Sequence, residues 1–156
     1  MDGITLQNSP SFHFVPNQCV NVEARNLKIY VPFTYPNTDG IDPSDCQGVT
    51  ITNCIIDDGD DDITVKGGRV NGVIGIGCQD ITVSDCTFLH GHGLSIGSET
   101  DDSVKNLTVT NCIFNGTTNG VRLKSLTGAG EIMQNLRYIG VTMKNVLNPF
   151  FYRFKL

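Results

Sequence analysis

The sequence has few of the residues that favour helices. Alanine occurs twice and glutamate three times in 156 residues, although both are strong helix formers. No apolar run approaches the ~18 residues of a membrane-spanning helix, and no signal segment with basic, apolar and small-residue parts follows Met1. We therefore expect a protein nearly without helices and without a membrane partner.

Basic residues are also in the minority. Eleven Lys and Arg face sixteen Asp and Glu, which gives a formal net charge of −5. A protein that follows a phosphate backbone needs an excess of cations on its surface. The composition therefore predicts no nucleic-acid partner.

The abundant residues favour short strands joined by tight turns. Val and Ile occur 14 times each and Thr 15 times, beside 17 Gly and 14 Asn. β-Branched side chains lose rotamer freedom in helices and pack well on a pleated sheet. Gly and Asn accept the positive φ angles of sharp corners. These counts predict an all-β protein.

An internal repeat indicates the architecture. Five copies of one strand pattern cover residues 22–29, 49–56, 81–88, 107–114 and 136–143. Their starts lie 27, 32, 26 and 29 residues apart. A second short apolar motif follows the first in each unit, at Ile41, Ile63, Leu94 and Val121. Hairpin strands would recur every ~8–12 residues, so this period excludes a hairpin array.

The repeat instead predicts a right-handed single-stranded parallel β-helix with about five to six coils. We expect residues 1–156 to form one such domain. Equivalent positions of successive coils then lie above one another. One column of this kind holds Asn26, Asn53, Asp85 and Asn111. Their side chains can bond backbone groups from coil to coil, so we interpret this column as structural.

The six cysteines follow the same register. One column holds Cys54, Cys86 and Cys112, and the other holds Cys19, Cys46 and Cys78. An even number of cysteines is compatible with a disulfide framework. One Cys per coil on a shared face instead favours buried, mostly reduced thiols that pack as small apolar groups. A pair such as Cys46 with Cys78 stays an alternative if the corners bend.

Polar residues of different types share another register. Each of the following stands two residues before an apolar strand position: Asp39, Asp61 and His92. Asp60 adjoins this column, and Arg122 and Lys124 leave a later strand on one face because strand side chains alternate. Taken singly, such motifs are more often structural than functional. Their coincidence on neighbouring coils predicts a functional site.

The residue types of this site suit hydrolysis of a glycosidic bond in an acidic sugar. Two carboxyl groups can protonate the leaving oxygen and activate water. Crowded carboxylates raise the proton affinity of at least one of them, and the two cations can pair with a substrate carboxylate. His90 and His92 flank Gly91 and could suggest a metal site, but only two imidazoles are nearby and the carboxylates there already have a role in catalysis. The cysteines show no zinc-type ligand spacing. We therefore expect neither a metal nor a cofactor.

Four motifs of the site resemble, in order, the signatures of the polygalacturonase family of glycoside hydrolases, family 28. They are NTDGID at residues 37–42, GDD at 59–61, GHG at 91–93 and RLK at 122–124. Upstream, NSP at residues 8–10 and His13 are similar to a further segment of that family. The resemblance covers essentially the whole chain.

The resemblance implies a right-handed β-helix enzyme that cleaves α-1,4-galacturonan, the backbone of pectin, with inversion. It implies the roles of six residues: Asp60 as general acid, Asp39 and Asp61 as the pair that activates water, His92 as a group that tunes or relays protons, and Arg122 and Lys124 as ligands of the galacturonate carboxylate. It also implies an extracellular location. The alternative is a catalytically weak or inert fragment that binds galacturonan or self-assembles.

The sequence departs from the family pattern in three respects. Asp62 stands where many relatives have Cys or Asn, and its charge either raises the pKa of the adjacent acid or is turned away by strand alternation. Tyr152 is the candidate counterpart of a tyrosine that relatives carry one coil beyond the RLK motif. Family members are more than twice this long, so we expect a solenoid truncated at both ends, whose uncapped ends form homo-oligomers.

Overall fold

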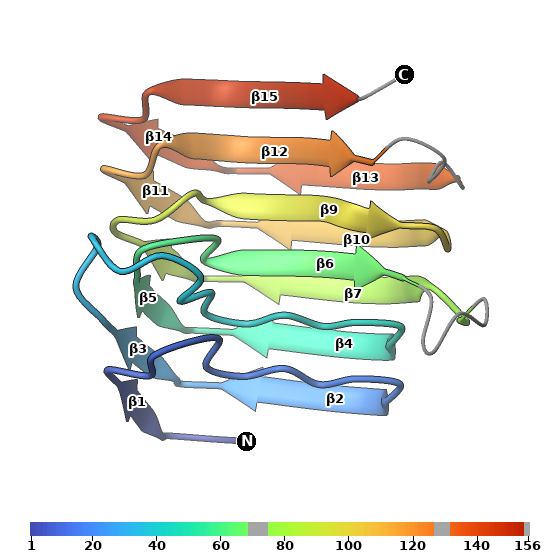
Figure 1. Ribbon diagram of the computed structural model, residues 1–156, viewed down its shortest axis with the longest axis horizontal. Coiled ribbons are helices and arrows are strands. Elements are labelled where there is room, and N and C mark those ends of the chain that lie inside the picture. Colours follow the sequence, from blue (N-terminus) through green and yellow to red (C-terminus); the bar gives the residue numbers. More distant parts are fainter. Residues whose placement is uncertain (69–74, 127–131, 155–156) are drawn as a thin grey trace.

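The computed structural model describes residues 1–68, 75–126 and 132–154, and within these ranges it contains strands and no helix. The strands form three sheets (Figure 1). The first contains β1 (Thr5–Gln7), β3 (Lys28–Tyr30), β5 (Ile55–Asp57), β8 (Thr87–Phe88), β11 (Ile113–Asn115) and β14 (Thr142–Lys144). The second contains β2 (Val20–Arg25), β4 (Gln47–Thr52), β7 (Cys78–Ser84), β10 (Val104–Thr110) and β13 (Met133–Ile139). The third contains β6 (Ile63–Gly67), β9 (Leu94–Thr100), β12 (Asn119–Ser125) and β15 (Asn148–Phe154).

Every strand pair in these sheets is parallel, and the register follows the sequence repeat. The second sheet aligns Val22 with Val49, Val49 with Ile81, Ile81 with Leu107, and Leu107 with Leu136. These are the corresponding positions of the five repeat copies. The predicted parallel β-helix and its register are therefore confirmed, including the weak fifth copy.

The third sheet is shorter than the other two. Six strands form the first sheet of the described structure, which fits the predicted five to six coils, but about four turns carry a strand in the third sheet. In the earlier turns, isolated bridges from Phe14 to Ile41 and from Ile41 to Ile63 take its place. The acidic residues lie in the turns directly before the bridged positions Ile41 and Ile63.

The interior consists of apolar side chains stacked in columns, and the cysteines belong to it. Cys54, Cys86 and Cys112 are at most 1% exposed, and the thiol of each points to the carbonyl two residues earlier at 3.2–3.4 Å. Cys46 and Cys78 are fully buried, whereas Cys19 is only partly buried. The predicted columns are present, with Cys19 at their more open end.

The Asn column forms one corner of the solenoid. Asn26, Asn53, Asp85 and Asn111 have φ angles of 55°, 53°, 55° and 53°, in the left-handed region that Asn and Asp tolerate. The Asn53 amide nitrogen donates to the Asn26 side-chain oxygen at 2.7 Å. The column is structural, as the sequence predicted.

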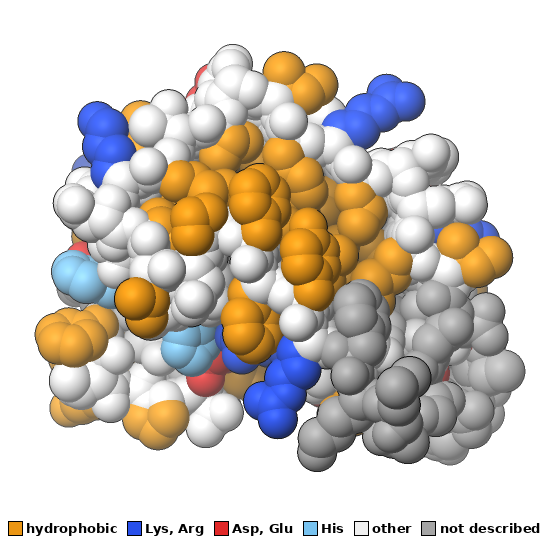
Figure 2. Space-filling view, turned by 90° about the horizontal axis from the view of Figure 1, so that it is seen from above, with side chains coloured by type: hydrophobic (Ala, Val, Ile, Leu, Met, Phe, Trp, Pro, Cys, Tyr) orange, Lys and Arg blue, Asp and Glu red, His pale blue; other side chains and the backbone are white. Residues whose placement is uncertain are grey.

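The end of the solenoid that carries β14 and β15 is apolar (Figure 2). Large exposed apolar side chains there include Ile139, Leu147, Phe150 and Tyr152, which are 56–77% exposed.

No helix in the described residues has the length and hydropathy of a membrane span.

Candidate active site

The acidic turn before β6 lies between two turns of neighbouring coils. Ile41 bridges to Ile63, and Ile63 aligns with Leu94. The residues two positions earlier, Asp39, Asp61 and His92, therefore occupy equivalent places on successive coils. The register predicted from the sequence is correct for this column.

Asp61 is the most strongly bonded of the predicted site residues. Its side chain is 1% exposed. The Ser95 hydroxyl and the Arg122 guanidinium donate to Oδ1 at 2.5 and 2.8 Å, and the Lys124 ammonium donates to Oδ2 at 2.6 Å. Both predicted substrate-binding cations thus contact a carboxylate of the protein itself. Two positive charges and a hydroxyl hold this carboxylate in one orientation.

Asp60 forms a pair with His92. The imidazole Nδ1 of His92 lies 3.0 Å from Asp60 Oδ1, and the Asn37 backbone N–H donates to Asp60 Oδ2 at 3.1 Å. The His92 backbone N–H also donates to the Asp60 carbonyl oxygen. Both side chains remain partly exposed, at 24% for Asp60 and 34% for His92. A ligand at the surface can therefore reach this pair.

Asp39 lies deeper, beside a second ion pair. Its Oδ2 accepts from the Thr64 hydroxyl at 3.3 Å and lies 3.8 Å from the Lys66 ammonium. Lys66 bonds Asp42 more closely, at 2.7 Å. The ring nitrogen Nδ1 of His13 lies 3.1 Å from the Asp39 carbonyl oxygen. His13 therefore contacts the backbone of the site rather than its carboxylates.

The crowding of carboxylates affects these residues unequally. Burial and the neighbouring charges of Asp60 and Asp61 raise the pKa of Asp39. Burial would also raise the pKa of Asp60, but the bonds from His92 and the Asn37 N–H outweigh it and leave this pKa lowered. The expectation that one crowded carboxyl gains proton affinity is confirmed for Asp39. It does not hold for Asp60, the predicted acid, because its polar contacts favour the ionised form.

Asp62 is turned away from the site, as one of the two sequence interpretations proposed. It is fully buried, and its Oδ2 accepts from the Gly93 backbone N–H at 2.9 Å. Burial and the charge of Asp58 raise the pKa of Asp62 itself. The pKa of Asp60 is lowered overall, so the presence of Asp62 does not leave this acid with a raised pKa.

Sequence reasoning missed Thr64 and Ser95, the hydroxyl donors to Asp39 and Asp61. The signal was available, because Thr64, Ser95 and Arg122 occupy one register position on β6, β9 and β12. Aligning the second strand motif one residue further would have found them. The contact of Lys66 with Asp42 had no comparable signal, since long side chains can reach several neighbours.

Tyr152 does not lie on the site face. It aligns with Leu123, which packs against the core, whereas Phe151 aligns with Arg122 and Arg153 with Lys124. The proposed counterpart of the family tyrosine is therefore wrong in orientation. A pocket on this face is lined by Ser98, Arg122, Lys124, Ser125, Leu126, Phe151 and Arg153. It adds a third cation beside the two predicted ones.

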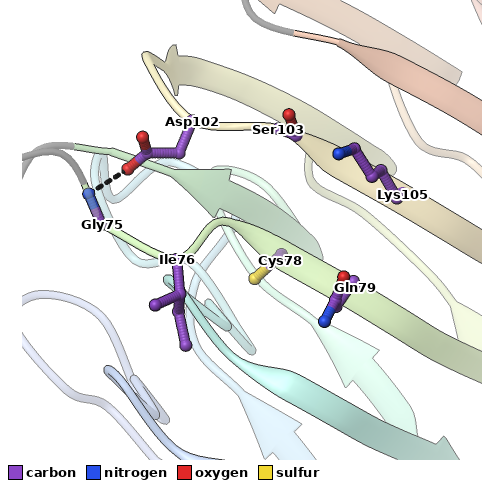
Figure 3. Close-up of a pocket in the computed structure, with 7 residues that line it drawn as sticks. All are labelled: Gly75, Ile76, Cys78, Gln79, Asp102, Ser103 and Lys105. Carbon is purple, nitrogen blue, oxygen red and sulfur yellow. Dashed lines mark hydrogen bonds between the residues drawn. The ribbon is translucent and has the colours of Figure 1, made fainter.

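Another pocket lies on a different sheet, away from the acidic cluster (Figure 3). Cys78 and Gln79 of β7 and Lys105 of β10 line it, and Asp102 accepts from the Gly75 N–H at its rim. None of the predicted site residues lines it. We therefore assign the candidate active site to the cluster around Asp61.

The spacing of the cluster also bears on metal binding. Asp60, Asp61 and His92 each offer a ligand atom within 4.8 Å of the others. However, two cations already neutralise Asp61, and His92 already contacts Asp60. His90 contacts Asp57 instead, at 2.6 Å. The contacts of these atoms suit proton transfer better than metal ligation.

Comparisons with known proteins identify the family. The family model for glycosyl hydrolases family 28 matches residues 1–153. An endo-polygalacturonase of Pectobacterium carotovorum subsp. carotovorum is 40% identical over 148 residues, which are 94% of this chain and 35% of that protein. A probable polygalacturonase of Arabidopsis thaliana is 38% identical over 154 residues, which are 96% of this chain and 32% of that protein. The chain thus spans about a third of the length of these relatives.

Solved structures agree. The polygalacturonase from Erwinia carotovora ssp. carotovora superposes with a TM-score of 0.91 at 35% identity, over 99% of this chain and 41% of that one. The hyperthermoactive exopolygalacturonase from Thermotoga maritima superposes with a TM-score of 0.89 at 33% identity, over 97% of this chain and 35% of that one. Family model, sequence and structure agree over nearly the whole chain, which belongs to glycoside hydrolase family 28.

Proposed function

We propose that this protein hydrolyses α-1,4-galacturonosyl linkages of polygalacturonate. The observation that carries the proposal is the arrangement around Asp61: a buried carboxylate held by Arg122 and Lys124 beside the partly exposed Asp60–His92 pair. It joins groups for acid–base catalysis to cations that suit a uronic acid. The similarity to proteins named polygalacturonases supports the same function.

Asp60 is the proposed general acid, and His92 is its proton partner. The contact of His92 Nδ1 with Asp60 Oδ1 lets one proton be shared between them. The pKa of Asp60 is lowered in the free protein. The acid form is therefore most populated at acidic pH, and a polyanionic substrate that covers the pair would raise that population by removing water and adding negative charge.

Asp39 and Asp61 are the proposed groups that orient and activate the attacking water. The ligand atoms of Asp60 and Asp61 lie within 4.8 Å, closer than the ~6.5–9.5 Å typical of inverting enzymes. A covalent route through Asp61 is nevertheless disfavoured, because it is 1% exposed and both of its oxygens are bonded. We therefore propose attack by water, and hence inversion, rather than a covalent intermediate on Asp61.

Arg122 and Lys124 are the proposed ligands of the galacturonate carboxylate at the cleavage site, shared with Asp61. Arg153 extends this row by one coil, and Phe151 lies beneath the Arg122 guanidinium, with its ring centre 6.0 Å away. Cations on successive coils suit a polymer that carries one carboxylate per sugar. The excess of negative charge on the protein makes such local cations necessary for binding a polyanion.

The alternative is a catalytically inert fragment that binds galacturonan. The presence of the whole acid–base set with the cations favours the hydrolase, and so does the family. Release of reducing ends from polygalacturonate tests the choice, with Asp60→Asn and a neutral polysaccharide as controls. Release that depends on Asp60 supports hydrolysis. Binding without any release would favour the inert fragment.

We also propose that the protein acts outside the cell, where pectin lies.

We further propose that copies of the protein associate through the apolar end at β13, β14 and β15. Within the described residues these are the terminal strands of the three sheets, and exposed apolar side chains lie beside them. Sheet edges of this kind pair readily with another copy. Association that increases over a hundredfold concentration range in light scattering supports this pairing. A monodisperse monomer throughout that range would contradict it.

A further inference from the structure

Two buried carboxyl groups, Asp58 and Asp62, lie beneath the active site and have no part in the chemistry proposed above. Both side chains are fully buried. Each has one oxygen without a hydrogen-bond partner among the described residues, Oδ2 of Asp58 and Oδ1 of Asp62. An ionised carboxylate in such a place carries a large desolvation cost.

The other oxygen of each group binds the backbone of a turn that carries a site residue. Asp58 Oδ1 accepts from the Asp60 backbone N–H at 3.1 Å. Asp62 Oδ2 accepts from the Gly93 backbone N–H at 2.9 Å, directly after His92. The two carboxyls therefore fix the two turns whose side chains form the Asp60–His92 pair.

Gly91 lies between the two carboxyls. A Cβ atom at Gly91 would lie 2.4 Å from Asp58 Oδ1 and 3.0 Å from Asp62 Oδ2. It would also lie 2.6 Å from the Asp60 carbonyl oxygen. The absence of a side chain at this position lets both carboxyls pack against the turn of His92.

The charges around this pair are predominantly negative. Asp58, Asp61 and Asp57 all act on Asp62, and Asp39, Asp61 and Asp60 act on Asp58. The nearby cations are used elsewhere: Lys124 and Arg122 bind Asp61, Lys66 binds Asp42, and His90 and His92 contact Asp57 and Asp60. No cation in the described residues forms an ion pair with Asp58 or Asp62 in these contacts.

We propose that Asp58 and Asp62 are positioning residues that carry their protons at neutral pH and, as uncharged acids, hold the Asp60 and His92 turns in register. The buried geometry supports the protonated form. Burial also raises the pKa of Asp58 to about 9 and that of Asp62 well above its usual value. The positioning part rests on the proposed function, whereas the protonation does not.

The protonation can be tested by stability alone. A carboxyl that keeps its proton on folding binds more protons in the folded state, so the stability of the parent falls as pH rises above the ordinary value of 3.8. Asp62→Asn is neutral in both states. The ratio of its folding constant to that of the parent should therefore increase by about tenfold per pH unit between pH ~4 and ~7.

Denaturant unfolding at several pH values measures this ratio, and Asp58→Asn should behave in the same way. Asp85→Asn is the matched control, because Asp85 is an exposed carboxyl of the Asn corner. Its ratio should change much less with pH. A ratio for Asp62→Asn that stays flat would show an ionised Asp62 and overturn the proposal, whether or not the protein hydrolyses galacturonan.

The positioning role has its own readout. Asp62→Leu keeps the branching at Cγ but is bulkier and removes the acceptor of the Gly93 N–H, so kcat should fall and the titration of His92 followed by NMR should shift. Asp62→Asn should restore both, since its amide oxygen can accept the same bond. Equal kcat and equal His92 titration in parent, Asn and Leu variants would contradict positioning. If Asp62→Leu does not fold, Asp62→Ala, which also lacks the acceptor of the Gly93 N–H but adds no bulk, replaces it in this comparison.

Discussion

The Asn corner and the acidic corner of this solenoid are both formed by stacking equivalent positions of successive coils, but they differ in the residue types that are stacked. At the Asn corner, successive coils repeat Asn or the closely similar Asp, and Asn53 donates to the equivalent Asn26. At the acidic corner, the same kind of register brings together Asp39, Asp61 and His92. Residues of the same kind in register can form hydrogen bonds with one another and thereby stabilise the solenoid. Residues of different kinds in register leave charged groups and exchangeable protons that can act on a ligand.

The two corners also differ in burial. Asn26 and Asn53 are exposed, so water also forms hydrogen bonds with their amides. Asp61 is 1% exposed, and its partners come from two later strands: Ser95 of β9, and Arg122 and Lys124 of β12. The acidic corner therefore depends on contacts between distant residues, and a single substitution should affect it in a different way from the Asn corner.

The largest expected difference is in hydrolysis. Asp60→Asn or Asp61→Asn should lower kcat by ~10²–10⁴, the usual loss for a general acid or base, while Asn53→Ala should leave kcat near that of the parent. Reducing-end release from polygalacturonate measures all three. Activities within about threefold of the parent for both Asp variants would remove the catalytic assignment.

The next effect concerns binding. Arg122→Gln and Lys124→Gln should each raise the Kd for oligogalacturonate about 10- to 100-fold. This corresponds to the free energy of one charge-assisted hydrogen bond. Arg153→Gln should weaken it less, since it lies one coil further away. Calorimetry on the Asp60→Asn background measures this without turnover. Equal losses on a neutral oligosaccharide would indicate a structural role for these cations.

A third prediction concerns the pH profile. Burial raises the pKa of Asp60, but the contact with His92 and the Asn37 N–H lower it overall. If the protonated acid is required, kcat/KM should fall as pH rises through this pKa. His92→Gln removes a lowering contact, so the alkaline limb should move to higher pH even though the maximum rate decreases. A limb that stays in place would exclude Asp60 as the titrating group.

Stability should respond at the Asn corner. Asn53→Ala removes the bond to Asn26 and places Ala at a φ of 53°, which should cost about 1–2 kcal/mol. Asn53→Gly should cost less because Gly accepts this angle freely. Thermal unfolding measures both. An Ala variant as stable as the parent would mean that the Asn column contributes little to the free energy of unfolding.

The smallest effect is expected at the thiols. The six cysteines are in the free form in the structure, and five are buried. Titration of the denatured protein without reductant should find about four or more free thiols of the six, and reductant should hardly change Tm. Three disulfides, or a large decrease of Tm on reduction, would contradict the packing interpretation of the two columns.

Much of this structure could be predicted because the sequence repeat determines which residues of successive coils pair with one another. Val49, Ile81 and Leu107 recur at one spacing, and their alignment alone brought Asp61 and His92 to neighbouring coils. The Asn column and the buried cysteines followed from the same alignment. Tyr152 was offered as the counterpart of a family tyrosine from its residue type, whereas its position in the strand alternation puts it on the face of Leu123 rather than on that of Arg122 and Lys124.

The sequence by itself determined the coil period, the columns and the face on which the site residues gather, since side-chain alternation and parallel stacking leave little choice once the repeat is aligned. Only the tertiary structure decided which partners each ionisable group has. Arg122 and Lys124 bind Asp61, His92 lowers the pKa of Asp60, and Asp62 is buried under Gly93. These outcomes depend on burial and on distances of a few ångströms between side chains of different coils. No spacing along the chain encodes such distances.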